Sequence, residues 1–221
     1  METEIKLAID SKEKLFEIID ADWFKEYSMD KKPRSVAMLI NSYFDTPDFK
    51  LRVNHCTVRS RLYSIDGEKK YEHTVKLGSN ADNGLYQRYE WNVDADSEKF
   101  DLEHFIYSVE HVADSSDPVE ILKDHFNNID VDSLTKICST EVERSTYLFG
   151  YGDSIMEACF DIGKAIADGK STPICELEME LISGDVNDLK ELSDFIVSKS
   201  DLRPSNESKF KKCLLLMGFE D

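Results

Sequence analysis

The sequence predicts an α+β fold in which antiparallel strands close into a β-barrel with a charged lumen and with helices packed outside. Two observations lead to this prediction. Several strand-like segments alternate charged and apolar side chains, and segments with helical periodicity stand between them. Like charges stacked along one strand face repel each other and gain nothing from plain solvent, so we expect these faces to look toward one another across a shared interior.

The first strand-like segment, residues 2–9, has the most informative pattern. Glu2, Glu4 and Lys6 share one of its faces, and mostly apolar side chains share the other. Two carboxylates with an ammonium group next in line can hold a divalent cation and a phosphate oxygen on one surface. For this segment alone, an ordinary half-buried strand with its charges in water is an equally good interpretation.

The same alternation recurs in five later segments. The recurrence favours the barrel, because a closed barrel lets all six charged faces share one interior. The side chains on these faces are Arg59 and Arg61 in residues 57–62, Thr74 and Lys76 in residues 72–77, Arg88, Glu90 and Asn92 in residues 88–93, Glu157, Cys159 and Asp161 in residues 155–161, and Glu176, Glu178 and Glu180 in residues 174–181.

Helices are expected between these strands and after the last of them. Each has either a start signal or one apolar face. They are residues 10–24 with an Asp10–Glu13 capping box, residues 101–112, a helix that starts at 117–120 with Pro118 in its first position, residues 185–199, and a last helix opened by Pro204 and Ser205. A further strand is expected at residues 37–44, and loops are expected near Gly67 and over residues 78–84.

Composition excludes several classes of protein. Hydrophobic residues make up 41% of the 221 residues, which is enough for a core, and a net charge of −18 disfavours binding to nucleic acid. Apolar runs are too short to span a membrane. The first residues do not resemble a secretory signal, and the five scattered cysteines suit a reducing compartment, so a cytoplasmic protein is expected. Cationic side chains on the strand faces, inside an acidic exterior, indicate a small polyanion as ligand.

The motif Glu2-x-Glu4-x-Lys6 resembles the signature of the CYTH superfamily, whose members are also called triphosphate tunnel metalloenzymes. Further matches follow in the family's order and span nearly the whole chain, so we expect residues 1–221 to form one CYTH domain. They are residues 43–52 for the second strand and turn, Arg59 and Arg61 for the paired arginines, Lys76 for the lysine strand, Arg88-x-Glu90 for the next strand, Asp161-x-Gly163 for a turn, residues 173–181 for the late acidic strand, and Ser208-Lys209 for the closing segment. The closing segment departs from the family at Lys212, which lacks the planar fork of the usual arginine.

This resemblance implies an eight-stranded antiparallel barrel around a tunnel open at both ends. It also implies hydrolysis of inorganic triphosphate to pyrophosphate and phosphate with Mg²⁺ or Mn²⁺, as in the bacterial inorganic triphosphatases. Those relatives often have a second, helical domain, which we do not expect in this chain. A small polyanionic substrate is the expected partner, with no nucleic acid and no membrane, and a homodimer is one option for the oligomeric state.

Two other kinds of activity stay open. Class IV adenylate cyclase and thiamine triphosphatase are alternative enzymes, although the sequence shows no aromatic cluster that can be assigned to a base. A noncatalytic module that binds polyphosphate or nucleotide is the alternative from another class. Carboxylates that face a polyanion argue against such a module, because a pure polyanion binder gains nothing from them.

The resemblance and the charged faces together predict the site. The first strand and the lysine strand supply the residues expected to act in catalysis, Glu4, Lys6 and Lys76. Seven cationic groups are expected to bind triphosphate, and five carboxylates are expected to hold the metal. The cationic groups are Lys6, Arg59, Arg61, Lys76, Arg88, Arg144 and Lys209, and the metal ligands are Glu2, Glu4, Asp161, Glu176 and Glu178. Arg144 can equally be a structural ion-pair partner, Glu90 is expected to orient Arg88, and the role of Glu180 is left open.

Overall fold

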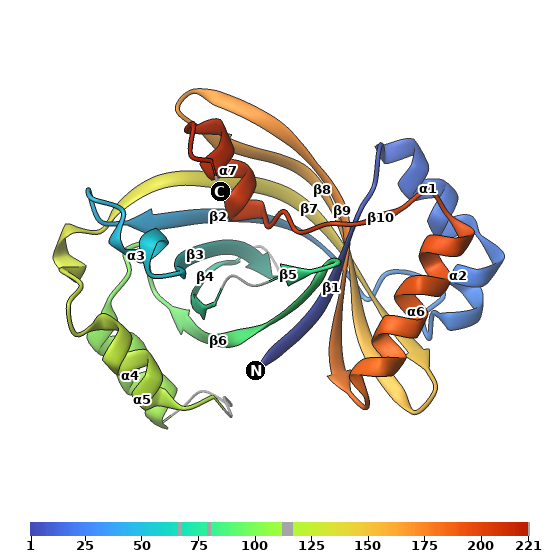
Figure 1. Cartoon of the computed structure of the whole chain (residues 1–221), viewed down its shortest axis with the longest axis horizontal. Coiled ribbons are helices and arrows are strands. Elements are labelled where there is room, and N and C mark those ends of the chain that lie inside the picture. The colour runs from blue at the N-terminus through green and yellow to red at the C-terminus, as the bar shows by residue number, and fades with distance from the viewer. Residues whose placement is uncertain (66–67, 79–80, 112–116, 221) are drawn as a thin grey trace.

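Eight long strands form a closed antiparallel barrel in a computed structural model that describes residues 1–65, 68–78, 81–111 and 117–220. The strand order is β1-β9-β8-β7-β2-β3-β4-β6, and the pairing of β1 with β6 closes the ring (Figure 1). The strands are β1 (Glu2–Ala8), β2 (Ser35–Asp45), β3 (Cys56–Ile65), β4 (Glu68–Leu77), β6 (Leu85–Ala95), β7 (Thr135–Tyr151), β8 (Ser154–Ala167) and β9 (Lys170–Ser183), with two short additions, β5 (Ala81–Asp82) and β10 (Arg203–Pro204). The predicted α+β barrel is confirmed.

Seven α-helices accompany the barrel in the described residues. They are α1 (Lys12–Asp20), α2 (Asp22–Tyr27), α3 (Lys50–Val53), α4 (Leu102–His111), α5 (Val119–Phe126), α6 (Val186–Lys199) and α7 (Lys209–Leu216), and a short 3₁₀ turn covers Val131–Ser133. No helix among the described residues is both long enough and apolar enough to cross a bilayer. Part of the loop predicted near Gly67, part of the 78–84 loop and the last residue of the predicted 101–112 helix lie outside the described residues.

Several local predictions need correction. The helix predicted over residues 10–24 is divided into α1 and α2 at Ala21, whose backbone is extended, and Ser11 rather than Asp10 caps α1. The last helix begins at Lys209, because the Ser208 side chain accepts from the Lys211 backbone N–H as its N-cap. Asp161-x-Gly163 is not a turn but lies inside β8. A β-carbon at Gly163 would lie 1.9 Å from the Glu141 carbonyl oxygen, so close strand packing explains the glycine.

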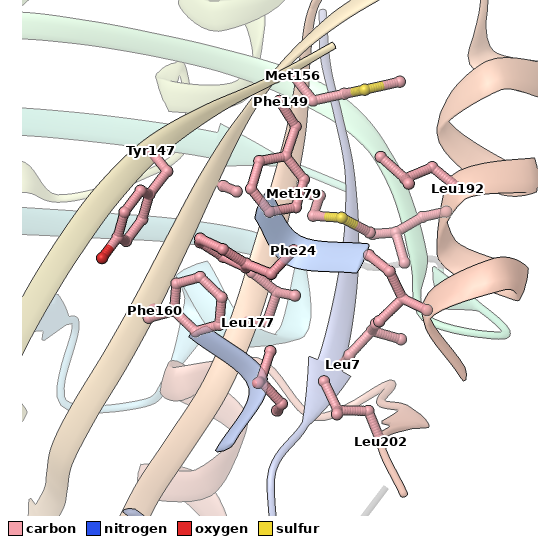
Figure 2. Close-up of a cluster of buried hydrophobic side chains, with 14 of the residues drawn as sticks. Leu7, Phe24, Tyr147, Phe149, Met156, Phe160, Leu177, Met179, Leu192 and Leu202 are labelled. Carbon is pink, nitrogen blue, oxygen red and sulfur yellow. The ribbon is translucent and has the colours of Figure 1, made fainter. Parts of the chain in front are cut away.

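The apolar outer faces of the strands are covered by helices on two sides of the barrel. On one side, Phe24 of α2 and Leu192 of α6 pack against side chains of β1, β7, β8 and β9, including Leu7 and Phe160 (Figure 2). On another side, Phe105 of α4 packs over β3, β4 and β6 in a second cluster. Because alternate side chains point to opposite faces, this outward packing directs the charged side chains of the same strands into the lumen.

Helix α7 has a different place from the other helices. Its Cys213 is buried in a third cluster with Val142, Ala165 and Ile174, which lie on the lumen side of their strands. The helix therefore covers part of the barrel interior at one end, as its position over β7, β8 and β9 shows in Figure 1. This placement brings Lys209, in the first turn of α7, into the lumen, where its side chain is almost fully buried.

Candidate active site

The lumen contains a cavity of about 210 Å³, which we call the central cavity. All seven cations predicted to bind triphosphate line it, together with three of the five predicted metal ligands, Glu2, Glu4 and Glu178. Asp161 and Glu176 lie behind this lining, buried in the wall. Contributions come from strands around the whole ring and from α7, so the tertiary fold assembles charged side chains that are up to 207 residues apart, from Glu2 to Lys209.

One group of charges is centred on the first strand. The Arg88 guanidinium donates to Glu2 at 2.6 Å and to Glu4 at 2.7 Å, and Lys76 Nζ lies 2.8 Å from Glu2 and 2.7 Å from Glu90. Burial raises the pKa of Glu2, but the charges of Lys76 and Arg88 outweigh burial and hold that pKa well below its usual value. Glu90 thus pairs with Lys76 rather than with Arg88, which the sequence had suggested.

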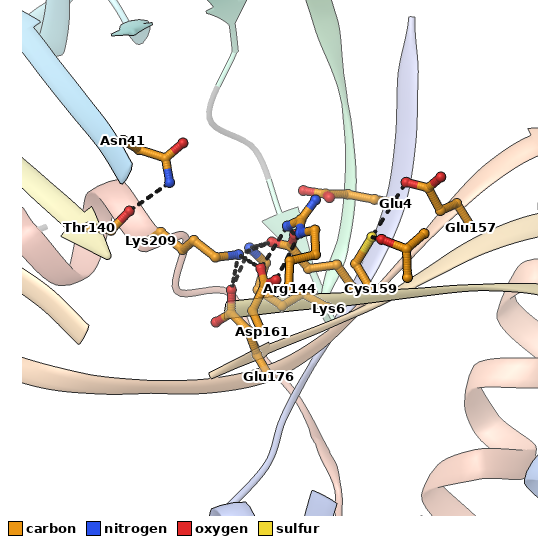
Figure 3. Close-up of polar contacts among 12 residues, drawn as sticks. Glu4, Lys6, Asn41, Thr140, Arg144, Glu157, Cys159, Asp161, Glu176 and Lys209 are labelled. Atoms are coloured by element: carbon orange, nitrogen blue, oxygen red, sulfur yellow. Dashed lines mark hydrogen bonds and ion pairs between the residues drawn. The ribbon is translucent and has the colours of Figure 1, made fainter. Parts of the chain in front are cut away.

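A second group surrounds the ammonium of Lys209 (Figure 3). Lys209 Nζ lies 2.6 Å from Asp161, 2.5 Å from Glu176 and 2.7 Å from Glu178. Arg144 contacts Asp161 at 2.6 Å and Glu178 at 2.5 Å. These three carboxylates lie close enough together to hold a metal ion, but Lys209 Nζ already occupies the position at which they converge.

The ion pairs in this second group lower the pKa values of two of its carboxylates, Asp161 and Glu178. Burial raises the pKa of Asp161, but the adjacent Arg144 and Lys209 outweigh it, so the net shift is downward. Glu178 behaves in the same way, with Lys209, Lys6 and Arg144 outweighing burial. Groups with such low pKa values stay ionised and act as fixed counter-charges for the cations around them.

Glu4 and Glu180 differ from Glu2, Asp161 and Glu178 because nearby cations do not outweigh their burial and their acidic neighbours. They are direct neighbours across β1 and β9, and Glu157 faces Glu180 across β8 and β9. Burial, followed by the charges of Glu2 and Glu178, raises the pKa of Glu4. Burial, followed by the charges of Glu2 and Glu90, raises the pKa of Glu180 to about 8. Within the described part of the chain Glu180 has no ion pair, although it lines the central cavity.

Glu180 is the residue that sequence reasoning left undecided. The available signal was its position as the third glutamate of the Glu176-x-Glu178-x-Glu180 row, but its place near the end of the charged segment made it less distinctive. What distinguishes it is its register opposite Glu4, and register is a property of the barrel. We refer to Glu4 and Glu180 as the acidic pair.

The arginines of β3 form a region with an excess of positive charge. Arg59 donates to Thr74 Oγ1 at 2.5 Å and to Glu72 at 3.2 Å, and its buried Nε has no partner among the described residues. Arg61 donates to the Asn41 amide oxygen at 2.9 Å. Burial, followed by repulsion from Arg59 and Arg144, lowers the pKa of Arg61 to about 10. A site that holds crowded guanidinium groups with few carboxylates is suited to an anion.

The structure is a closed barrel whose inward charges surround a small central cavity. Comparison with known proteins assigns this barrel to a family. The chain belongs to the CYTH domain family, whose model matches residues 1–214. The inorganic triphosphatase of Haemophilus influenzae is 28% identical over 176 residues, which cover 80% of this chain and 45% of that protein. The chain therefore spans about half the length of this curated relative.

Solved structures support the same fold. One of them is HpAC1 from Hippeastrum, an adenylyl cyclase candidate described as having a dominant triphosphatase activity. It superposes with a TM-score of 0.67 at 17% identity, and the match covers 100% of this chain and 98% of that one. The PH1819 protein of Pyrococcus horikoshii superposes with a TM-score of 0.57 at 12% identity and covers 99% of this chain and 100% of that one. At these identities the likeness establishes the barrel fold.

Proposed function

We propose that this chain hydrolyses inorganic triphosphate to pyrophosphate and phosphate inside the central cavity, in a reaction that depends on Mg²⁺ or Mn²⁺. The proposal rests on one observation above all: seven cationic side chains and an incompletely balanced acidic pair line the same cavity of about 210 Å³. Similarity to the Haemophilus influenzae inorganic triphosphatase supports it. We further propose that residues 1–221 form a single CYTH domain, since strand β1 closes the barrel and α7 supplies Lys209 to it.

The cationic lining fits the substrate. Triphosphate has roughly four to five negative charges near neutral pH, since each terminal phosphoryl group titrates with a pKa near 6. Arg59 and Arg61 have the largest unused capacity, because their carboxylate neighbours are few, and each presents a planar fork that matches two phosphate oxygens. Arg144 is partly neutralised by Asp161 and Glu178, so we assign it to the site as a weaker phosphate contact.

The carboxylates present fit a hard divalent cation. Mg²⁺ and Mn²⁺ prefer carboxylate oxygens, water and substrate phosphates as ligands. We propose Glu2, Glu4 and Glu180 as the residues that hold the metal, because a cation would offset the burial and the acidic neighbours that raise the pKa values of Glu4 and Glu180. Asp161 and Glu176, predicted as ligands from the sequence, would instead position Lys209, while Glu178 serves Lys6, Lys209 and Arg144.

The remaining residues have roles that follow from charge. A bound divalent cation supplies polarisation of the phosphate oxygens. Lys6 Nζ is held by Glu178 at 2.6 Å and Lys76 Nζ by Glu2 at 2.8 Å, so both ammonium groups are fixed before substrate arrives. We assign them to the neutralisation of charge on the triphosphate oxygens during transfer, where preorganised cations are most effective. Glu4 is the third residue that we assign to catalysis, because it forms an ion pair with Arg88 and lies opposite Glu180.

Phosphate release from inorganic triphosphate, measured with Mg²⁺, with Mn²⁺ and with excess chelator, tests the proposal. Glu4→Gln keeps the side-chain shape and removes the carboxylate charge, so turnover should be lost while the fold is retained. Glu26→Gln, an exposed change on α2, serves as the matched control and should behave as the parent. Full metal-dependent turnover in Glu4→Gln would show that the Glu4 carboxylate is not needed for the reaction. Absence of turnover in the parent would favour a noncatalytic binding module.

A further inference from the structure

The two arginines of β3 line the central cavity with little negative charge beside them. In the described part of the chain, Glu72 is the one acidic side chain that forms an ion pair with either arginine. The same Glu72 oxygen lies 3.2 Å from Arg59 and 3.6 Å from Arg61, so two guanidinium groups share a single counter-charge. Since one carboxylate cannot fix both guanidinium groups, other contacts must set their directions.

Arg61 is held by an uncharged pair, Asn41 of β2 and Thr140 of β7, which we call the first polar pair. Strand register places Asn41 directly between Thr140 and Arg61. Arg61 Nε donates to the Asn41 amide oxygen at 2.9 Å, and Asn41 Nδ2 donates to the Thr140 hydroxyl at 2.9 Å (Figure 3). Both members of the pair are buried. Thr140 thereby sets which side of the amide faces Arg61, because a reversed amide would present N–H groups to a guanidinium that can only donate.

Arg59 is held by the second polar pair, Thr74 of β4 and Asn92 of β6. These three residues are cross-strand neighbours in one row of the barrel. Thr74 Oγ1 accepts from Arg59 at 2.5 Å and donates to the Asn92 amide oxygen at 2.7 Å, and Asn92 Nδ2 donates to Glu90 at 3.0 Å. A hydroxyl whose one hydrogen points at Asn92 presents its lone pairs to Arg59, so this pair also sets the direction of a guanidinium.

Uncharged partners and carboxylates have different consequences for an anion site. A carboxylate holds a guanidinium firmly but cancels its charge, as Asp161 and Glu178 do for Arg144. An amide or hydroxyl oxygen accepts the same N–H and leaves the positive charge intact. The arginines of β3 are therefore fixed in place and still charged, which is the combination that a phosphate site needs.

We propose that the two polar pairs are positioning residues: each pair directs one arginine of β3 toward the phosphates and leaves the charge of that arginine uncancelled. This inference rests on the proposed function, since it takes Arg59 and Arg61 as phosphate contacts, and it adds what sets their direction and strength. Arg59 Nε fits this role, because it is buried and has no hydrogen-bond partner among the described residues, so one donor remains for a phosphate oxygen.

Asn41→Asp tests the first polar pair, because it keeps the size and the acceptor oxygen and adds a negative charge. The Thr140 hydroxyl can rotate to donate to the new carboxylate, so the hydrogen bonds are retained. The empty protein should melt at or above the Tm of the parent, because the new ion pair offsets the repulsion that acts on Arg61. The calorimetric Kd for inorganic triphosphate with Ca²⁺ should nevertheless rise roughly tenfold. Asn128→Asp, which adds the same charge in an exposed turn, is the matched control and should bind as the parent does.

Thr74→Val and Thr74→Ser test the second polar pair without any change of charge. Valine keeps the shape and removes the hydroxyl, so the Kd for inorganic triphosphate with Ca²⁺ should rise roughly tenfold, whereas serine keeps the hydroxyl and should stay within about twofold of the parent. In assays of phosphate release, Thr74→Val should raise KM and leave kcat within about threefold, because the lost contact acts on binding. Thr172→Val, at a half-buried position of β9, is the matched control for the loss of a strand hydroxyl.

The outcomes separate this inference from the proposed function. A purely structural role makes stability and affinity change together, so Asn41→Asp with a lower Tm, or with the parent's Kd, would overturn the first polar pair. The parent's Kd in Thr74→Val, or equal losses in the valine and serine variants, would overturn the second. If the parent binds triphosphate but releases no phosphate, the proposed function fails, and the Kd values still decide the two pairs. If the parent binds no triphosphate, both proposals fail.

Discussion

Glu178 and Arg61 line the same cavity, yet their removal should have opposite consequences for the empty protein. Glu178 balances three cations, with Lys6 at 2.6 Å, Arg144 at 2.5 Å and Lys209 at 2.7 Å. Arg61 has one short contact, to the Asn41 amide, and a longer one of 3.6 Å to Glu72, and neighbouring cations repel it. We therefore expect Glu178→Ala to destabilise the protein and Arg61→Ala to change stability little.

The expected size follows from burial. Removing one partner of a buried ion pair costs about 3–5 kcal/mol, because the partner charge is left without compensation. Lys209 keeps Asp161 and Glu176, and Arg144 keeps Asp161, so the loss in Glu178→Ala should lie near the lower end, about 3 kcal/mol. For a chain of this size that corresponds to a fall in Tm on the order of 6–12 °C. Arg61→Ala should stay within about 1 kcal/mol of the parent, because relief of repulsion offsets the lost hydrogen bond.

Urea unfolding and melting curves of the ligand-free proteins provide the measurement, and equal slopes in urea confirm that only stability has changed. Inorganic triphosphate with Ca²⁺ should raise the Tm of the parent by mass action and raise that of Arg61→Ala much less. Glu26→Gln controls for loss of an exposed carboxylate. If Arg61→Ala loses as much stability as Glu178→Ala and still shows the full ligand shift, the two residues do not border one polyanion site.

Four further predictions concern the acidic pair, Lys209 and the substrate. The pKa of Glu180 in the folded protein is raised from 4.5 to about 8, so the parent should lose stability as pH rises between these values. The Tm of Glu180→Gln should therefore exceed that of the parent by a margin that grows across this range. A difference in Tm that does not depend on pH would contradict the raised pKa of Glu180. Added Mg²⁺ should stabilise the parent more than Glu180→Gln, as thermal shifts can show. Lys209→Met should destabilise by about 3 kcal/mol in urea unfolding, since the buried Asp161 and Glu176 and the half-buried Glu178 lose a cation, and near-parental stability would refute that network. Inorganic triphosphate should have a higher kcat/KM than ATP or thiamine triphosphate, and a reversed order in initial-rate assays would make an organic triphosphate the main substrate.

The sequence by itself determined which side chains face inward. Alternation is a local property with a period of two residues, so the charged faces of residues 2–9, 57–62, 72–77, 88–93 and 174–181 could be recognised one segment at a time. The recurrence of these faces predicted a closed barrel, and the cationic side chains on them predicted a site for a small polyanion. The order of family-like motifs along the chain then indicated the family. These inferences need no knowledge of which strand lies beside which.

Only the tertiary structure decided how the inward charges divide their roles. Strand register places Glu180 beside Glu4 and leaves both incompletely balanced, whereas α7 brings Lys209 into contact with Asp161 and Glu176. Ion pairs depend on distances between residues far apart in the chain, so sequence spacing could not separate the incompletely balanced carboxylates, Glu4 and Glu180, from those that cations balance. A second cavity of about 410 Å³ beside the central cavity could not be predicted from the sequence for the same reason, because α3, β6, α7 and the residues that follow α7 form its walls only after the barrel has closed.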